Sequence, residues 1–430
     1  MDKEAPEQAR SILMIAYVYP PIAYGGTYRS LRLSKYLSQL NYEITVLTIK
    51  KQRDLQNDDG LLSAVPPTIK IERTSTFDPW RSYQKVKGRL LASRPGRILG
   101  KIISAGLFIV NNPDHMIFWI PFAVWRGRKL IREKNIKVIY TSTPPHSGQL
   151  IGYLLKKMTG VKWIADLRDP ILGNLGGSNW GAYERRVHAW LERLVCREAD
   201  HVIANTEYAG KKLASKYPDC PVSTVRNCFD PDDFDGFPKS RSGVFTVAHI
   251  GSLYAFRKID AVLNALELVV GQEQLTPEDI RLRLVGLKDQ RIVDQIAQSR
   301  ISKYISIEDM VPHAHAIKIM AESTLLLLIK GFGPDSGAQI PGKLYEYLGS
   351  GNKILYLGPA DAEAANIIRE YNAGCIVEDD VDDLANVLLQ EFKAWREEGE
   401  TSSLSINRTL ADFSAEAMAE KFDRIIRSLC

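Results

Sequence analysis

The chain has 430 residues, of which 45% are hydrophobic and 25% are charged. This length is ample for two hydrophobic cores and exceeds what one doubly wound domain usually holds, so we expect two domains. The composition excludes a disordered or fibrous class, and a formal net charge of only +5 argues against a dedicated nucleic-acid-binding protein.

Cysteine usage and hydropathy indicate the compartment. The cysteines are odd in number and scattered, which predicts reduced thiols rather than a disulfide framework or a zinc site. No apolar run approaches the length of a membrane span, and the apolar stretch at residues 12–18 is too short for a signal peptide. We therefore expect a cytoplasmic protein whose membrane contact, if it has one, is peripheral and on the cytoplasmic face.

The first predicted elements are a strand at residues 11–17, a glycine turn, a helix, and a strand at residues 44–49. This order is typical of a parallel crossover unit, whose ligands bind at the carboxyl ends of the strands. Gly25 and Gly26 stand in the turn. They allow either close approach of the backbone to a phosphate or an acceptor, or simply a tight turn.

A basic and apolar insert follows at about residues 81–132. Lys and Arg are dense there and alternate with Leu, Ile and Phe. Basic charge beside an apolar face suits the surface of an anionic membrane. The alternative is a pair of helices packed on their own domain, with the charges in solvent.

The strand and helix pattern resumes with a strand at residues 138–141, and His146 stands in the loop after it. His146 could bind a substrate or transfer a proton, or it could only cap the next helix. Another strand, at residues 163–165, runs toward Arg168 and Asp169, which read as an ion pair at a strand end. A polar stretch with Pro and Gly at residues 232–243 predicts the interdomain linker.

The second half begins with a strand at residues 244–250, and we expect His249 to lie in its core. The turn Gly251-Ser252 leads to Arg257 and Lys258. These two cations could neutralise a diphosphate leaving group, or they could lie in solvent.

The most informative segment is residues 340–357, IPGKLYEYLGSGNKILYL. Pro341 presets a first helical turn, and Gly342 lets a ligand approach backbone amides that favour a phosphate. Lys343 adds a positive charge, and Glu346 lies one turn on, where a carboxylate can accept hydrogen bonds from a vicinal diol such as ribose. The alternative is an amphipathic helix with Lys343 and Glu346 in solvent.

The sequence lacks the motifs that are typical of several other enzyme classes. Gly25 is not followed by the Gly-x-Gly-x-x-Gly spacing of a nicotinamide site, and the sequence lacks a Gly-x-Ser-x-Gly elbow, a Walker loop and a His-Glu-x-x-His motif.

Eight segments occur in this order over nearly the whole chain: YPPIAYGGTYRSLRLSKYL, YTSTPPHSGQLIGYLL, WIADLRDP, VIANTEYAGKKL, VRNCFDPDDF, FTVAHIGSLYAFRK, LRLVG and IPGKLYEYLGSGNKILYLG. Together they resemble the family-four retaining glycosyltransferases of GT-B fold, also called group 1. The resemblance implies an α/β protein of two Rossmann-like doubly wound domains that face a cleft. We expect an acceptor domain at residues 1–238, a donor domain at 243–410, and a terminal helix at 411–430 that returns to the first domain.

The resemblance also implies roles for single residues. Glu346 corresponds to the carboxylate that binds the donor ribose, and the amides of Lys343 and Leu344 would contact the phosphates. One position departs from the family, because Ala338 stands where many members have a second Glu; Asp335 or Gln339 could substitute for it. The residues predicted to bind the donor are Glu346, Lys343, Leu344, Gly342, Gly251, Ser252, Gly25 and Gly26, and those predicted to act in catalysis are Arg257, Lys258 and His146.

The implied chemistry is attack by an acceptor hydroxyl on the face from which a nucleoside diphosphate departs. It depends on positioning and on stabilising the leaving group, so it needs neither a protein nucleophile nor a metal cofactor. The expected partners are a nucleotide diphosphate sugar and a sugar or lipid-linked sugar acceptor, in cell-surface polysaccharide or glycolipid synthesis. A nucleotide-sugar epimerase or hydrolase of the same fold, and a non-catalytic binding module, remain as alternatives.

Overall fold

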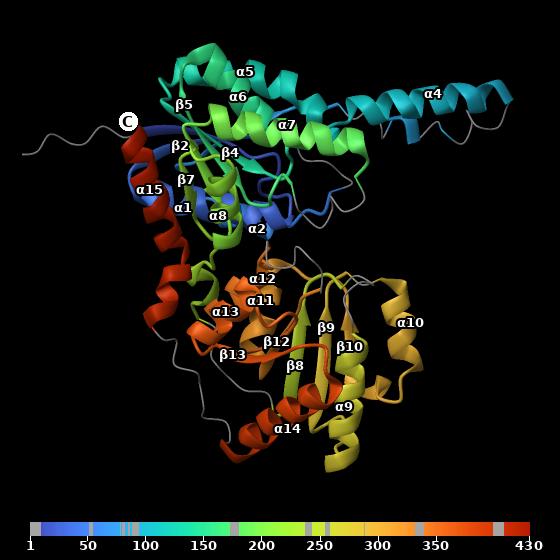
Figure 1. Cartoon of the computed structure of the whole chain (residues 1–430). Helices are drawn as coiled ribbons and strands as arrows, with labels where there is room; N and C mark the ends of the chain where they lie inside the picture. The colour runs from blue at the N-terminus through green and yellow to red at the C-terminus, as the bar shows by residue number, and fades with distance from the viewer. Residues whose placement is uncertain are drawn as a thin grey trace, which may run out of the picture. The chain divides into compact units, whose positions relative to one another are not determined.

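The computed structural model divides the chain into two compact units, each with its own parallel sheet (Figure 1). The described residues are 10–50, 55–77, 79, 82–84, 87, 94–172, 180–236, 243–253, 259–287, 289–331, 339–398 and 408–430. The first unit comprises Met1–Arg226 and Ala419–Cys430, and the second comprises Asn227–Met418. The division comes before the predicted linker at residues 232–243.

The described part of the first unit holds a seven-stranded sheet in the order β3-β2-β1-β4-β5-β6-β7. All neighbouring strands are parallel. The strands are β1 (Arg10–Ile15), β2 (Tyr42–Ile49), β3 (Lys70–Thr74), β4 (Val138–Thr143), β5 (Lys162–Leu167), β6 (His201–Ala204) and β7 (Val222–Thr224). The strand order reverses between β1 and β4, and such a reversal opens a ligand site at the carboxyl ends of the strands.

Helices connect these strands. They are α1 (Gly25–Gln39), α2 (Gly60–Ser63), α4 (Arg94–Val110), the 3-10 turn η1 (His115–Trp119), α5 (Ile120–Glu133), α6 (Ser147–Thr159), α7 (Ala182–Glu198) and α8 (Glu207–Lys216). The terminal helix α15 (Ala415–Leu429) contributes its last turns to the same unit. There the hydroxyl of Tyr42 donates to Asp423 at 2.6 Å, and the rings of Tyr140 and Phe422 lie 5.6 Å apart.

The described part of the second unit holds a six-stranded parallel sheet in the order β10-β9-β8-β11-β12-β13. The strands are β8 (Phe245–Ile250), β9 (Ile280–Val285), β10 (Ile305–Glu308), β11 (Leu325–Ile329), β12 (Lys353–Leu357) and β13 (Gly374–Val377). The helices are η3 (Pro231–Phe234), α9 (Asp260–Glu273), α10 (Gln290–Gln298), η4 (Ser302–Tyr304), α11 (His313–Glu322), α12 (Lys343–Ser350), α13 (Glu363–Glu370), α14 (Val381–Glu398) and η7 (Arg408–Phe413).

The apolar run of β11 shows why the second sheet is buried on both faces. Alternate side chains of a strand point to opposite faces. Leu325 and Leu327 accordingly belong to the cluster that packs with α9, whereas Leu326 and Leu328 belong to the cluster that includes α12 and α13. A strand covered by helices on both sides reads as a continuous apolar run, as predicted here.

The basic and apolar insert separates into two parts. In α5, the side chains of Ala123, Leu130 and Ile131 are buried in the core of the first unit, which agrees with packing on its own domain. Helix α4 differs, because most of its large apolar side chains are exposed. Among the helices that the structure describes, none combines the length and apolar character that a membrane span requires.

The two parallel sheets covered by helices confirm the predicted fold class, a pair of Rossmann-like α/β units.

Candidate functional site

In the second unit, the loop after β8 begins with a glycine that is in close contact with its neighbours. Gly251 has φ 123°, a conformation that side chains other than glycine rarely adopt. A Cβ atom on Gly286, after β9, would lie 2.8 Å from the Gly251 backbone, so the two loops touch through glycines. A Cβ atom on Gly251 would in turn lie 2.8 Å from Nζ of Lys343. The ammonium of Lys343 therefore lies over the carboxyl end of β8, and Ser252, partly exposed, follows Gly251.

Lys343 is oriented by a histidine that the sequence pattern predicted only as a core residue. Nδ1 of His249 lies 2.9 Å from the carbonyl oxygen of Leu327, and only a protonated nitrogen can donate to that oxygen. Nε2 of His249 is then the acceptor for Nζ of Lys343, at 2.9 Å. His249 is fully buried, as predicted, but it also has a polar role.

Glu346 lies on the same helix, α12, and also has a histidine partner. Nε2 of His313, at the start of α11, donates to Oε1 of Glu346 at 3.1 Å. A second carboxylate, Asp233, lies 4.0 Å from the same nitrogen. The side chains of Glu346 and His313 are only 15% and 12% exposed. Glu346 is thus a largely buried carboxylate, not the solvated one of an ordinary amphipathic helix.

The start of α12 agrees only partly with the predicted phosphate site. Gly342 is exposed, and a Cβ atom there would meet no other atom closer than 4.0 Å. The Leu344 amide, however, already donates to the carbonyl of Pro341 at 3.0 Å. It could contact a phosphate only by sharing that hydrogen bond.

In the first unit, the predicted glycine turn is the first turn of α1. A Cβ atom on Gly25 would meet nothing within 4 Å, whereas one on Gly26 would lie 2.2 Å from the guanidinium of Arg168. Arg168 is 9% exposed and donates to the carbonyl of Pro144 at 3.1 Å. Gly26 is therefore needed for contact with Arg168, whereas Gly25 leaves its surroundings open.

His146 is buried beside the start of α6. It is 7% exposed, and its Nδ1 has no hydrogen-bond partner among the residues that the structure describes. Burial lowers its pKa to about 4, although the nearby carboxylate of Asp114 acts to raise it. Asp114, not His146, satisfies the start of α6, because its carboxylate accepts from the Ser147 amide at 2.8 Å. His146 is thus a neutral imidazole that makes no cap hydrogen bond.

A buried ion pair lies at the carboxyl ends of the strands in the first sheet. Asp166, at the end of β5, accepts from Nε of Arg29 at 2.8 Å and from the hydroxyl of Tyr140 at 2.5 Å. Arg29 also donates to the carbonyl of Val225 at 2.9 Å, so it joins α1 to the end of the unit. The sequence pattern did not predict this network, and burial beside Asp166 raises the pKa of Tyr140 well above its ordinary value.

Several predicted residues cannot be placed. Arg257, Lys258, Asp335 and Ala338 lie outside the described residues. Gln339 is described, and its carbonyl accepts from Nζ of Lys330.

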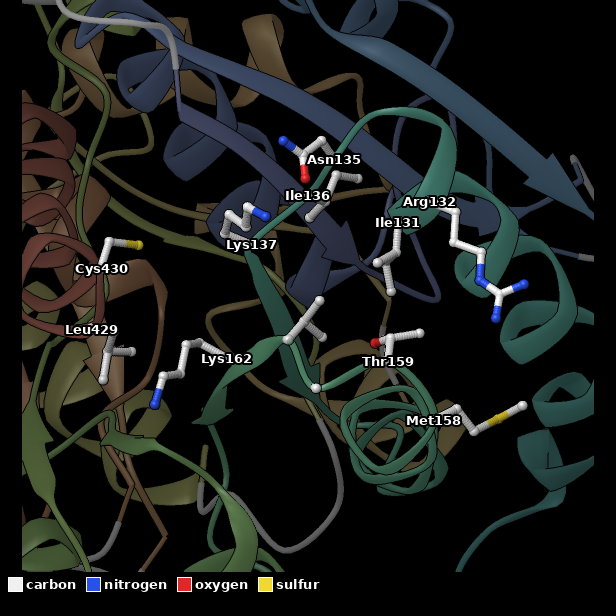
Figure 2. A pocket seen from close by; sticks show the side chains of 12 residues that line it. Ile131, Arg132, Asn135, Ile136, Lys137, Met158, Thr159, Lys162, Leu429 and Cys430 are labelled. Carbon is white, nitrogen blue, oxygen red and sulfur yellow. The ribbon is translucent and has the colours of Figure 1, made fainter.

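The first unit also contains a cavity of about 670 Å³ at the amino ends of its strands (Figure 2). Lys137 and Lys162 line it at the starts of β4 and β5, together with Arg132 and the terminal residues Leu429 and Cys430. None of the predicted site residues lines this cavity. Because parallel sheets bind ligands at the carboxyl ends of their strands, it is not the candidate site.

Comparison with known proteins now gives these features a context. Residues 25–228 match the sequence profile of the glycosyl transferase 4-like domain. The chain matches no curated protein in sequence.

Solved structures of low sequence identity share the fold over nearly the whole chain. Sucrose-phosphate synthase from Thermosynechococcus elongatus superposes with a TM-score of 0.62 at 14% identity, covering 98% of this chain and 99% of that one. A complex of S. aureus TarM gives 0.62 at 12% identity, covering 96% and 99%. WaaG, a glycosyltransferase of lipopolysaccharide biosynthesis, gives 0.53 at 15% identity, covering 94% and 99%.

The matched domain and the shared fold confirm the predicted resemblance to group 1 glycosyltransferases of GT-B fold, whereas retention stays a prediction. Residues 25–228 therefore match a glycosyl transferase 4-like domain, and the chain has the fold of the GT-B glycosyltransferases.

Proposed function

We propose that the chain is a retaining hexosyltransferase that moves a sugar from a nucleotide diphosphate sugar to an acceptor hydroxyl. The observation that carries the proposal is the pair Lys343 and Glu346, one turn apart on α12, each held by a buried or nearly buried histidine. A cation and a carboxylate on one short helix match the two polar parts of a donor, its diphosphate and its ribose.

Lys343 supplies the charge for the diphosphate. Its ammonium lies against Gly251, where the absence of a side chain leaves the space that Lys343 fills at the strand end. In the transfer step, the bond between the sugar C1 and the diphosphate oxygen breaks while the acceptor oxygen bonds to C1, and the proton of the acceptor hydroxyl passes to the released diphosphate. The departing diphosphate gains negative charge, and a fixed ammonium there stabilises the transition state more than the ground state. Arg257 and Lys258 would add to this charge.

Glu346 supplies the ribose contact. An ionised carboxylate has two oxygens and about four acceptor positions, so Glu346 can accept from His313 and also from the 2′ and 3′ hydroxyls of a donor. The resemblance to the group 1 glycosyltransferases assigns the same role to this position.

The first unit would supply the acceptor side. His146 is neutral because burial lowers its pKa to about 4, so its imidazole can accept a hydrogen bond or a proton from a hydroxyl. Gly25 offers an open backbone at the start of α1. We assign both residues to the acceptor and to the transferred sugar.

The structural relatives suggest the kind of substrate. The TarM complex contains UDP and a GlcNAc-glycerol, and WaaG is involved in lipopolysaccharide biosynthesis. A nucleotide diphosphate sugar as donor, and an acceptor that belongs to a cell-surface polysaccharide or glycolipid, agree with both. Because fixed cations can neutralise the charge of the diphosphate, we expect transfer without a metal cofactor. We expect the reaction to take place in the cytoplasm.

Product analysis tests the proposal. The intact protein is incubated with each of a panel of nucleotide diphosphate sugars, with and without glycan and lipid-linked acceptors, in buffer that contains a chelator. Release of the nucleoside diphosphate that requires an acceptor, with the α- or β-configuration of the donor retained in the product, is the expected result. Conversion of donor without an acceptor would favour an epimerase or hydrolase, and binding without turnover would favour a binding module.

A further inference from the structure

Helix α4 presents a row of apolar side chains that the rest of the described chain does not cover. Ile98 is 66% exposed, Ile102 is 63% exposed and Ile109 is 56% exposed. At 3.6 residues per turn these three positions fall on one side of the helix, and Leu99 and Val110, each about half exposed, widen the row. A contiguous exposed apolar surface of this kind marks an interaction site more often than it marks an ordinary surface.

The opposite side of α4 is held by specific contacts. The hydroxyl of Tyr83 donates to the carbonyl of Gly100 at 3.0 Å, and Oγ of Ser104 donates to that hydroxyl at 2.9 Å. Near the helix end, the hydroxyl of Tyr183 donates to the carbonyl of Ile109 at 3.1 Å. At 3.6 residues per turn, Gly100 and Ser104 lie on the side of the helix opposite Ile98 and Ile102, so these two side chains face away from Tyr83. The hydrogen bond from Tyr183 goes to the backbone of Ile109, whose side chain stays 56% exposed. Figure 1 shows α4 as one continuous helix that extends away from α5, α6 and α7.

Positive charge lies beside the row. Arg97 and Lys101 are exposed, and their spacing of four residues places them on one line next to Ile98 and Ile102. Residues 81–113 contain seven Lys or Arg and no Asp or Glu. An apolar row with cations along its border is typical of a helix that lies in the interface of an anionic bilayer, with the cations at the lipid headgroups.

We propose that α4 docks the first unit on an anionic lipid surface, with Ile98, Ile102 and Ile109 inserted below the headgroups. A second copy of the chain is a poorer occupant, because two α4 helices would bring the same basic borders together. A membrane span is excluded for α4 by its 17 residues, which are too few and too charged. The inference does not depend on the proposed transfer reaction, and its test needs no substrate.

Vesicle flotation of the full chain tests the proposal. We expect the protein to float with vesicles of phosphatidylcholine and phosphatidylglycerol but not with phosphatidylcholine alone, and to be released as salt is raised, because salt screens the charge attraction. The triple variant Ile98→Ser, Ile102→Ser, Ile109→Ser should reduce the bound fraction at least about tenfold, since it removes most of the inserted area.

A matched control uses exposed apolar residues of the second unit. Leu268, Leu287 and Ile307 are 40%, 57% and 40% exposed, so the triple replacement by Ser removes similar groups without touching α4. The control should float like the unmodified chain, and circular dichroism should show both variants folded.

Three results would overturn the proposal. The first is failure of the unmodified chain to float with anionic vesicles, and the second is equal flotation of the α4 variant and the control. The third is self-association in the absence of lipid, seen by sedimentation velocity and abolished by the α4 variant, because the occupant would then be a second copy.

Discussion

Nζ of Lys343 lies 2.9 Å from Nε2 of the buried His249, whose Nδ1 donates to the Leu327 carbonyl. The chain of contacts therefore runs from β11 through β8 to the first residue of α12, and it fixes both the tautomer of the imidazole and the direction of the ammonium. A histidine within a strand thus orients an ammonium that lies 94 residues later in the sequence.

Replacement of His249 should weaken donor binding without a direct contact to the donor. In His249→Leu the ammonium of Lys343 loses the His249 acceptor, and the Leu327 carbonyl loses one of its donors but keeps the Tyr347 hydroxyl at 3.5 Å. We expect donor affinity to fall about tenfold and the free energy of unfolding to fall by about 1 kcal/mol, the net contribution of a buried hydrogen bond. Calorimetry and urea denaturation measure the two effects.

The control for that variant is His315→Leu. His315 is exposed on α11, so its replacement should leave both quantities unchanged. Donor affinity that is the same in His249→Leu and in the unmodified chain would show that Lys343 needs no orienting partner.

The pKa of His146 predicts a pH dependence of stability. Because burial lowers it from 6.5 to about 4, the unfolded chain binds a proton in this range that the folded chain does not bind. The contribution of His146 to the free energy of unfolding is present above pH 6.5 and is lost as the pH falls toward 4, and the full loss is up to about 3 kcal/mol. Urea denaturation between pH 7 and 4.5 measures the slope of the free energy of unfolding against pH.

In His146→Asn that part of the slope should disappear. The exposed His115 provides the comparison, and His115→Asn should retain the slope of the unmodified chain. A slope in His146→Asn equal to that of His115→Asn would mean that folding does not lower the pKa of His146.

The neighbouring glycines of α1 separate a structural role from a ligand role. Gly26→Ala should lower both stability and activity, because its Cβ would meet the guanidinium of Arg168 at 2.2 Å. Gly25→Ala has open space and should leave stability unchanged or slightly raised, since alanine favours a helix. A fall in kcat/KM of about tenfold or more in Gly25→Ala, with the melting temperature maintained, is expected if substrate approaches this backbone; unchanged kinetics would assign the glycine to the turn alone.

The double variant Arg257→Ala, Lys258→Ala tests the diphosphate role of two residues outside the described part of the chain. Removal of leaving-group stabilisation should lower kcat by about a hundredfold while donor affinity changes less, because the charge develops mainly in the transition state. The surface pair Arg291 and Arg300 in the same unit, replaced by Ala, should retain full activity. Full activity in Arg257→Ala, Lys258→Ala would show that these two residues do not stabilise the leaving diphosphate.

The sequence predicted those features that depend on local pattern. The apolar run of β11, the Pro and Gly before α12 and the buried strand β8 are each readable within a few residues, so the fold class and the helix that carries Lys343 and Glu346 followed from them. The insert at residues 81–132 could be recognised, but not its separation into a packed α5 and an exposed α4, because the sequence does not show which apolar faces find a partner.

Partners distant in the sequence could not be predicted. His249 has apolar neighbours on both sides, which is the pattern of a core residue, and only the fold brings Lys343 to its ring. The same holds for His313 beside Glu346. The cap of α6 by Asp114 was missed for a similar reason, since 33 residues separate Asp114 from Ser147.

The most direct test of the central claim is the affinity of the chain for ribose and 2′-deoxyribose forms of its donor nucleotide, measured by calorimetry with Glu346→Gln. The unmodified chain should bind the ribose form about tenfold or more tightly than the deoxy form, because a charged hydrogen bond is lost. Glu346→Gln should bind both forms weakly and alike, whereas Glu322→Gln, an exposed surface change on α11, should bind as the unmodified chain does. Unchanged preference for ribose in Glu346→Gln would contradict the assignment of this helix to the donor.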